Sequence, residues 1–151
     1  MKRKTVAVVD YGSGNLRSVS QAVQHVAAAT DFDVRVTQSA QDVLDAERVV
    51  LPGQGHMGDC MRELAASGLL DAVLHAAANK PLFGVCVGMQ MLLTRSEEGP
   101  TDGLNLIPGQ VARFRLEGQK QQDTHSDHNG CRNPAADVFH HRDSRRHHAP
   151  T

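Results

Sequence analysis

Short apolar runs alternate with amphipathic helical patterns through most of this chain, and this alternation constrains the fold more than any other feature. Strands are expected at residues 5–9, 32–37, 48–51, 82–85 and 109–116, and helices at 16–28, 40–46, 57–64 and 69–78. Strands that alternate with helices form βαβ units, whose parallel sheet is covered by helices on both faces. We therefore expect an α/β fold with a doubly wound, mostly parallel sheet.

The composition changes abruptly near residues 116–118. Beyond that point Gln, Asp, Asn, Arg and His replace nearly every aliphatic residue, and Val138 and Phe139 are the only large apolar side chains. Such a segment cannot bury enough apolar surface to offset the entropy of ordering it. We expect residues 1–117 to be the N-terminal part of a folded domain. Residues 118–151 are expected to be a polar, His-rich tail that is disordered or out of frame.

Charge and cysteine content exclude several classes of protein. The formal net charge of -1 gives no reason to expect nucleic acid or an anionic membrane as a partner. No apolar run approaches the roughly 20 residues that span a bilayer, and the N-terminus leads directly into a strand instead of a signal sequence. Three cysteines are too few and too oddly spaced for a disulfide framework or a CxxC metal site. We expect a cytoplasmic protein without a metal or another cofactor.

Cys86 stands at a turn between an apolar strand and an apolar helical pattern in which Met89, Leu92 and Leu93 recur. Gly84 and Gly88 flank it, as small residues do where a nucleophile is held on a sharp turn. The start of a helix behind the sulfur favours a thiolate. A buried, inert cysteine is an equally good interpretation from spacing alone.

Three glycine-rich turns follow predicted strands, at residues 10–15, 52–55 and 84–88. Ligands of parallel sheets bind at the carboxyl ends of the strands. The first turn resembles a phosphate-binding loop only weakly, because it lacks the GxGxxG spacing. The second turn could present backbone N–H groups beside the Cys86 sulfur as an oxyanion hole, or it could simply be a turn. Nearby, His56 is expected to be a loop or surface residue and Cys60 to pack in the core.

Five segments occur in a fixed order: DYGSGNL at 10–16, LPGQG at 51–55, GVCVGMQ at 84–90, SEEG at 96–99 and GLNLIPG at 103–109. Together they resemble the glutamine amidotransferase subunit of imidazole glycerol phosphate synthase, a class I, triad-type amidotransferase of histidine biosynthesis. The resemblance covers residues 4–117. It implies a class I glutamine amidotransferase-like fold with a flavodoxin-like strand order, incomplete at its C-terminus.

The resemblance also implies a reaction. Cys86 would attack the side-chain amide of glutamine, giving ammonia and a γ-glutamyl thioester that water hydrolyses. The backbone N–H groups of Val87 and Gly55 would hold the oxyanion, the latter after a peptide rearrangement in the second turn. Gln90 and Glu98 match the positions that hold the substrate glutamine, whereas Glu97 is expected to be a solvated charge.

A partner is implied as well. Asn15 matches a position that faces a (β/α)8-barrel cyclase subunit, with which members of this family form a heterodimer. The cyclase receives the ammonia and makes imidazole glycerol phosphate and an aminoimidazole carboxamide ribotide.

The chain departs from this family in one respect. Family members carry a His-Pro-Glu motif near their C-terminus, which supplies the base and the residue that orients it, and this sequence has none. His140, His141, His147 and His148 are not followed by Pro-Glu, so no catalytic His or Glu is assigned. We expect a protein that is unstable and inactive when made alone. A noncatalytic partner-binding remnant, and another cysteine-elbow amidotransferase or hydrolase, remain as alternatives.

Overall fold

A four-stranded parallel sheet organises the first part of the molecule. The computed structural model describes residues 3–12, 14–115 and 129–132, the last four by their backbone alone. The sheet has the order β2-β1-β3-β4, with all neighbours parallel. Its strands are β1 (Lys4–Val9), β2 (Phe32–Thr37), β3 (Arg48–Gly53) and β4 (Leu82–Cys86). The predicted α/β fold with a flavodoxin-like strand order is confirmed.

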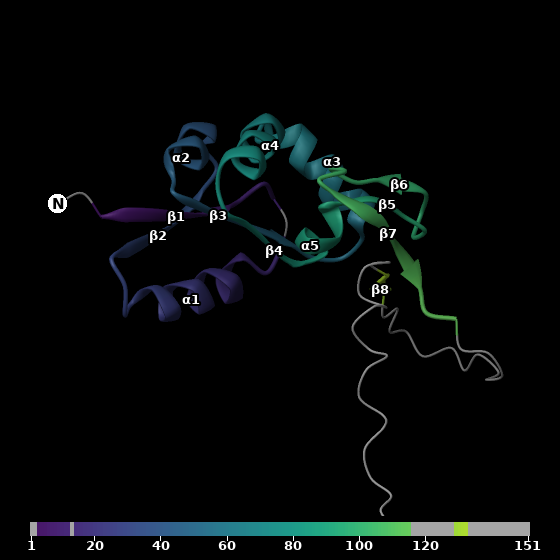
Figure 1. Ribbon diagram of the computed structural model, residues 1–151, viewed down its shortest axis with the longest axis horizontal. Coiled ribbons are helices and arrows are strands. Elements are labelled where there is room, and N and C mark those ends of the chain that lie inside the picture. Colours follow the sequence, from purple (N-terminus) through teal and green to yellow (C-terminus); the bar gives the residue numbers. More distant parts are fainter. Residues whose placement is uncertain (1–2, 13, 116–128, 133–151) are drawn as a thin grey trace, which may run out of the picture.

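Helices cover both faces of this sheet (Figure 1). The helix α1 lies on one face, and α2 and α4 lie on the other. The helices are α1 (Leu16–Ala27), α2 (Ala40–Asp45), α3 (Met57–Ser67), α4 (Leu70–Asn79) and α5 (Val87–Met91). Because the four strands are parallel, their carboxyl ends meet at one edge of the sheet, and the three glycine-rich turns follow strands at this edge.

The strand residues alternate between two apolar cores, as the two-residue period of a strand requires. Val8 and Val50 pack toward α1 with Val19, whereas Val9 and Leu51 belong to a larger core that includes α3, α4 and α5. The core is therefore unequal on the two faces, and the larger part lies opposite α1.

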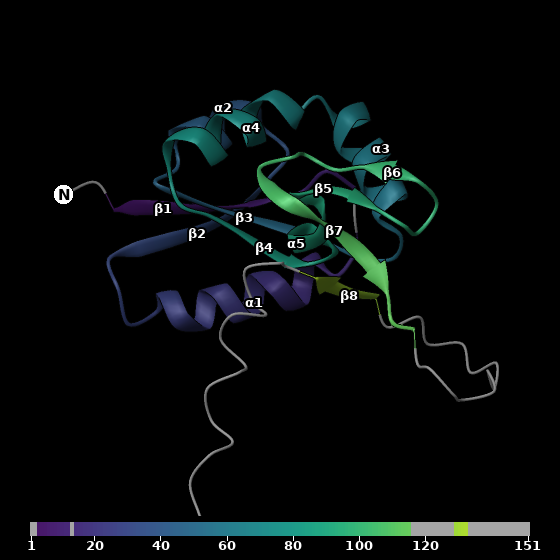
Figure 2. The same ribbon diagram turned by 45° about the vertical axis from the view of Figure 1, so that its right-hand side comes forward.

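A second sheet follows the elbow, the name used below for the turn at residues 84–88 that carries Cys86 (Figure 2). Its order is β6-β5-β7-β8, and its strands are β5 (Leu93–Ser96), β6 (Thr101–Asp102), β7 (Ile107–Arg113) and β8 (Asn129–Arg132). The expectation that the helical pattern behind Cys86 continues through Leu92 and Leu93 was wrong, because α5 ends at Met91 and β5 begins at Leu93. The backbone N–H groups of Leu104 and Leu106 bond to the carbonyls of Met91 and Leu92, which ends the helix and starts a strand.

The expected end of the third strand at residue 51 was also wrong, because Pro52 and Gly53 continue β3. Proline lacks a backbone N–H and is normally excluded from a central strand. Pairing of β3 with β1 ends at Val50, so no β1 carbonyl pairs with position 52 and the missing N–H of Pro52 breaks no bond to β1.

The predicted tail falls almost entirely outside the described residues. Residues 129–132 form β8, which pairs antiparallel with β7, so these four residues are a strand where we expected disorder. The domain boundary at residue 117 and the nature of residues 118–128 and 133–151 stay predictions. In the part of the chain that the structure describes, no helix is long and apolar enough to cross a membrane.

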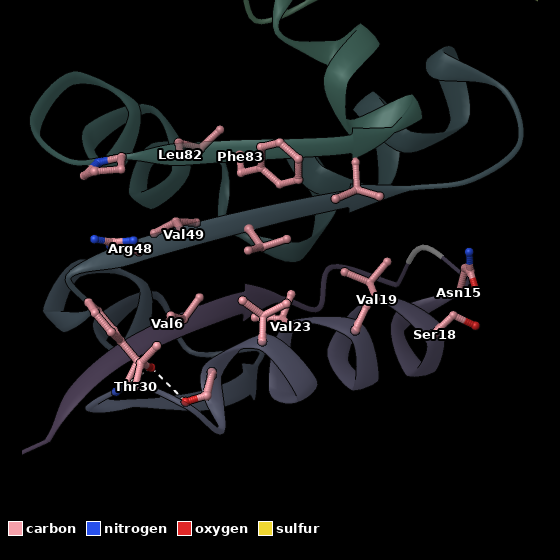
Figure 3. A pocket seen from close by; sticks show the side chains of 17 residues that line it. Val6, Asn15, Ser18, Val19, Val23, Thr30, Arg48, Val49, Leu82 and Phe83 are labelled. Carbon is pink, nitrogen blue, oxygen red and sulfur yellow. Dashed lines mark hydrogen bonds between the residues drawn. The ribbon is translucent and has the colours of Figure 1, made fainter.

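An apolar cavity of about 830 Å³ lies between α1 and strands β3 and β4 (Figure 3). Asn15 and Ser18 lie at one of its ends and Arg48 at the other. Phe83 on its β4 wall is 67% exposed, and β4 has no strand partner on its outer edge among the described residues. Cys86 does not line this cavity, so the cavity and the thiol are separate features.

Lys80 connects two helices through its ammonium group. The Lys80 Nζ lies 2.6 Å from the carbonyl oxygens of both Leu44 and Ala46, at the C-terminus of α2. A cation at this end of a helix offsets the unpaired carbonyls. We expect Lys80→Met to lower the free energy of unfolding by about 1–3 kcal/mol, measured by urea denaturation.

The same substitution at Lys4 is a matched control. The Lys4 ammonium pairs with the exposed carboxylate of Asp31, 3.2 Å away, and exposed pairs contribute little to stability. Equal destabilisation by Lys80→Met and Lys4→Met would show that the helix-end contacts have no special role.

Candidate functional site

Cys86 occupies a strained backbone position at the end of β4. Its φ and ψ angles are 56° and -121°, and it is the N-cap residue of α5. Residues other than glycine rarely adopt positive φ, and such strain concentrates at functional sites. Cys86 is exposed, so it is the exposed nucleophile candidate and not the inert core cysteine.

Three glycines allow β3, β4 and α5 to approach one another closely around Cys86. A Cβ atom at Gly88 would overlap the carbonyl oxygen of Leu51, and one at Gly53 would overlap the backbone nitrogen of Gly88. A Cβ at Gly84 would lie 2.6 Å from the Cα of Met89. Only hydrogen fits at these positions, so the glycines on both sides of Cys86 are required for the tight strand–turn–helix geometry.

The turn after β3 lies beside Cys86. Gly53 is the register partner of Cys86 in the parallel pair β3–β4, and Gly55 has a φ of 82°. The Cys60 thiol donates to the carbonyl of Gln54 at 3.2 Å, and the Tyr11 hydroxyl donates to the carbonyl of Pro52 at 2.6 Å. The backbone of this turn is therefore fixed on two sides.

Cys60 is only 1% exposed and belongs to the larger core, which confirms the prediction that it packs there. The hydrogen bond from its thiol to the Gln54 carbonyl was not predicted. Gln54 lies in the turn after β3 and Cys60 lies six positions later in α3, so no local pattern connects them.

A buried carboxylate lies near the same turn. The side chain of Glu98 is 8% exposed, and its Oε1 lies 2.9 Å from the Nδ1 of His56. The backbone N–H of Glu98 donates to the hydroxyl of Ser96, which is fully buried. His56 is 65% exposed, so the expected loop position is correct, but its contact with Glu98 was missed. The one available signal was the position of His56 directly after the glycine turn.

Glu97 and Glu98 separate at the end of β5. The Glu97 carboxylate accepts from the backbone N–H of Arg113 at 3.3 Å and lies 3.8 Å from the Arg115 guanidinium. Both residues lie in the turn after β5, and the backbone N–H of Glu97 donates to the carbonyl of Val111 in β7. Glu98 is thus the buried member of the pair and Glu97 the partly solvated one.

Gln90 contributes a polar atom that lacks a partner. Its Oε1 is buried and makes no hydrogen bond within the described residues. A buried acceptor without a donor costs about 1–3 kcal/mol. A ligand N–H group at this position would remove that cost.

The first glycine-rich turn lies next to the second. A Cβ at Gly14 would overlap the side-chain oxygen of Gln54. Asn15, the N-cap of α1, has a φ of 69° and is exposed. Val87, the first residue of α5, has a backbone N–H that cannot be satisfied within the helix.

A base for Cys86 is not found in the part of the chain that the structure describes, where no hydrogen bond joins the thiol to a histidine. His140, His141, His147 and His148 lie outside the described residues. Among residues 3–12 and 14–115, no three His, Cys, Asp or Glu side chains are close enough to hold a metal ion.

Known proteins resemble this chain over most of its length. The family profile described as glutamine amidotransferase class-I matches residues 7–148. The imidazole glycerol phosphate synthase subunit HisH of Nitrosospira multiformis is 52% identical over 117 residues, covering 78% of this chain and 54% of the relative. HisH of Dechloromonas aromatica is 56% identical over 111 residues, covering 74% and 51%.

A solved glutamine amidotransferase shares the fold, with a TM-score of 0.57 at 19% identity, covering 76% of this chain and 59% of the other. The chain spans about half the length of the curated relatives it matches.

Proposed function

Because the chain belongs to the class-I glutamine amidotransferase family, we propose that its elbow site attacks the side-chain amide of glutamine. The observation that carries the proposal is the geometry of Cys86. Its thiol is exposed, its backbone has a φ of 56°, and its strand β4 pairs with β3, which leads into the glycine-rich turn. The sulfur would add to the amide carbon, the carbon–nitrogen bond would break, and ammonia would leave a γ-glutamyl thioester. Water would then release glutamate.

The site offers groups for each part of this substrate. The negative charge that develops on the amide oxygen would be held by the backbone N–H groups of Val87 and Gly55, the latter after rotation of a peptide in the turn. The carboxylate of Glu98 suits the α-ammonium group of glutamine. The unpartnered Oε1 of Gln90 would accept a hydrogen bond from the bound substrate.

The ammonia has a proposed destination. The similar HisH proteins are subunits of imidazole glycerol phosphate synthase. We infer that this chain would deliver ammonia to a (β/α)8-barrel cyclase subunit in the cytoplasm, through the exposed face that carries Asn15. The heterodimer would make imidazole glycerol phosphate and an aminoimidazole carboxamide ribotide for histidine biosynthesis.

A noncatalytic role as a partner-binding remnant is the second candidate. It is favoured by the thiol of Cys86, which no hydrogen bond joins to a histidine in the part of the chain that the structure describes. General-base catalysis contributes about 10²–10⁴-fold in rate, so this chain is expected to turn glutamine over far more slowly than a complete triad. Copurification with the cyclase subunit without glutamine-dependent product would support the remnant.

Alkylation with a chloroketone analogue of glutamine tests the proposed site. The Cys86 sulfur displaces chloride from the chloromethyl carbon, forming a thioether, and the thiol proton passes to solvent. We expect saturable labelling of Cys86, slowed by added glutamine and abolished by Cys86→Ser, as measured by peptide mass spectrometry.

Cys60 is the internal control, since its burial should protect it from the same reagent. Labelling of Cys86 that is not saturable and is unaffected by glutamine would contradict the proposed function.

A further inference from the structure

We propose that His56 is a positioning residue, which holds the Glu98 carboxylate in the orientation that receives the α-ammonium group of glutamine. This inference rests on the proposed function. In this role His56 acts through Glu98 and contacts neither the Cys86 thiol nor the substrate.

The first argument is the burial of Glu98. A carboxylate that is removed from water must be compensated by hydrogen bonds or a countercharge. The Glu98 side chain is 8% exposed, and His56 Nδ1 lies 2.9 Å from its Oε1. An ionised carboxylate only accepts hydrogen bonds, so Nδ1 carries the proton in this contact.

The second argument is the placement of the two residues. His56 follows Gly55 directly and is the N-cap residue of α3, while Glu98 lies between β5 and β6, 42 residues farther along the chain. The contact therefore connects the turn beside Cys86 to the second sheet. It fixes the carboxylate in the turn between β5 and β6 relative to the turn beside the thiol.

The third argument is the chemistry of an imidazole donor. An arginine or lysine brings a fixed positive charge to a carboxylate, whereas an imidazole has a form that donates a hydrogen bond without cancelling the negative charge that attracts an ammonium group. The ring is largely exposed, which places it at the solvent side of the carboxylate.

The test compares two chloroketones that differ in one group, the glutamine analogue and the same compound without its α-amino group. The intact chain and the variants His56→Ala, His56→Asn and His75→Ala are alkylated over a range of concentrations of each. The half-saturating concentration and the maximal rate are measured separately. His75→Ala is the matched control, because His75 is an exposed histidine on α4.

We expect His56→Ala to raise the half-saturating concentration of the amino-bearing reagent about 10-fold, the size of one lost hydrogen bond to a charged group. The maximal rate and the reaction of the des-amino reagent should not change. His56→Asn keeps an N–H donor close to the position of Nδ1, so it should behave as the unaltered chain does. A merely structural role would affect both reagents alike and would not be rescued by asparagine.

The outcomes separate the two proposals. If the unaltered chain shows no saturation and no preference for the amino-bearing reagent, the proposed function fails and this inference fails with it. If that preference is present and His56→Ala retains it in full, the inference alone is overturned. Equal loss for both reagents would also overturn it.

Discussion

Replacing Gly88 with alanine is expected to destroy the folded state. The added methyl group would overlap the carbonyl oxygen of Leu51, which belongs to the backbone of β3 and cannot move without separating β3 from β4 or α5. Overpacking against a rigid backbone in the core costs about 4 kcal/mol or more, a large part of the stability of a small domain. Urea denaturation followed by circular dichroism should show loss of the cooperative transition.

Gly68→Ala is the control for this substitution. Gly68 has a φ of 77°, and nothing lies within 4 Å of the position its Cβ would take. Alanine there introduces backbone strain of about 1 kcal/mol without a collision. If Gly88→Ala were no more destabilising than Gly68→Ala, close contact between the elbow and β3 would not be what holds the site together.

Local patterns predicted the parallel sheet because each of its strands is short, apolar and followed by a turn. The run 32–37 was predicted without error, and the other strands of that sheet differ from their predicted bounds only at their ends. The elbow helix was predicted too long because Leu92 and Leu93 continue its apolar spacing. Hydrogen bonds from the segment after Gly103, which no local pattern reveals, decided its end.

The candidate site likewise has some features that the local sequence predicts and others that depend on distant contacts. Cys86 and its flanking glycines are contiguous in the sequence, so residues 84–88 alone indicated a sharp turn, although their spacing left an exposed nucleophile and a buried, inert cysteine equally open. The contact between His56 and Glu98 spans 42 positions and depends on how the second sheet packs against α3, so spacing could not predict it. Burial likewise separates Glu98 from Glu97, which differ in no local property of the sequence.

Replacing Glu98 with glutamine should remove the affinity of the site for the α-amino group of its ligand. The substituted side chain at position 98 keeps the size of glutamate and a hydrogen-bond acceptor, but it loses the negative charge that attracts an ammonium group. We expect the half-saturating concentration of the glutamine chloroketone to rise about 100-fold, since a hydrogen bond between charged groups is worth about 1.5–3 kcal/mol. Alkylation kinetics of Cys86 measure this directly.

Glu97→Gln is the matched control, the same change one residue earlier. The Glu97 carboxylate bonds to the backbone N–H of Arg113 and not to His56, so its loss should leave the half-saturating concentration unchanged. The reaction of Cys86 with iodoacetamide should be the same in both variants, because that reagent carries no ammonium group. Equal effects of the two substitutions would mean that a general negative charge attracts the reagent. A large effect of Glu98→Gln alone would require the buried carboxylate to lie within reach of a ligand attached to Cys86, as the proposed glutamine site demands.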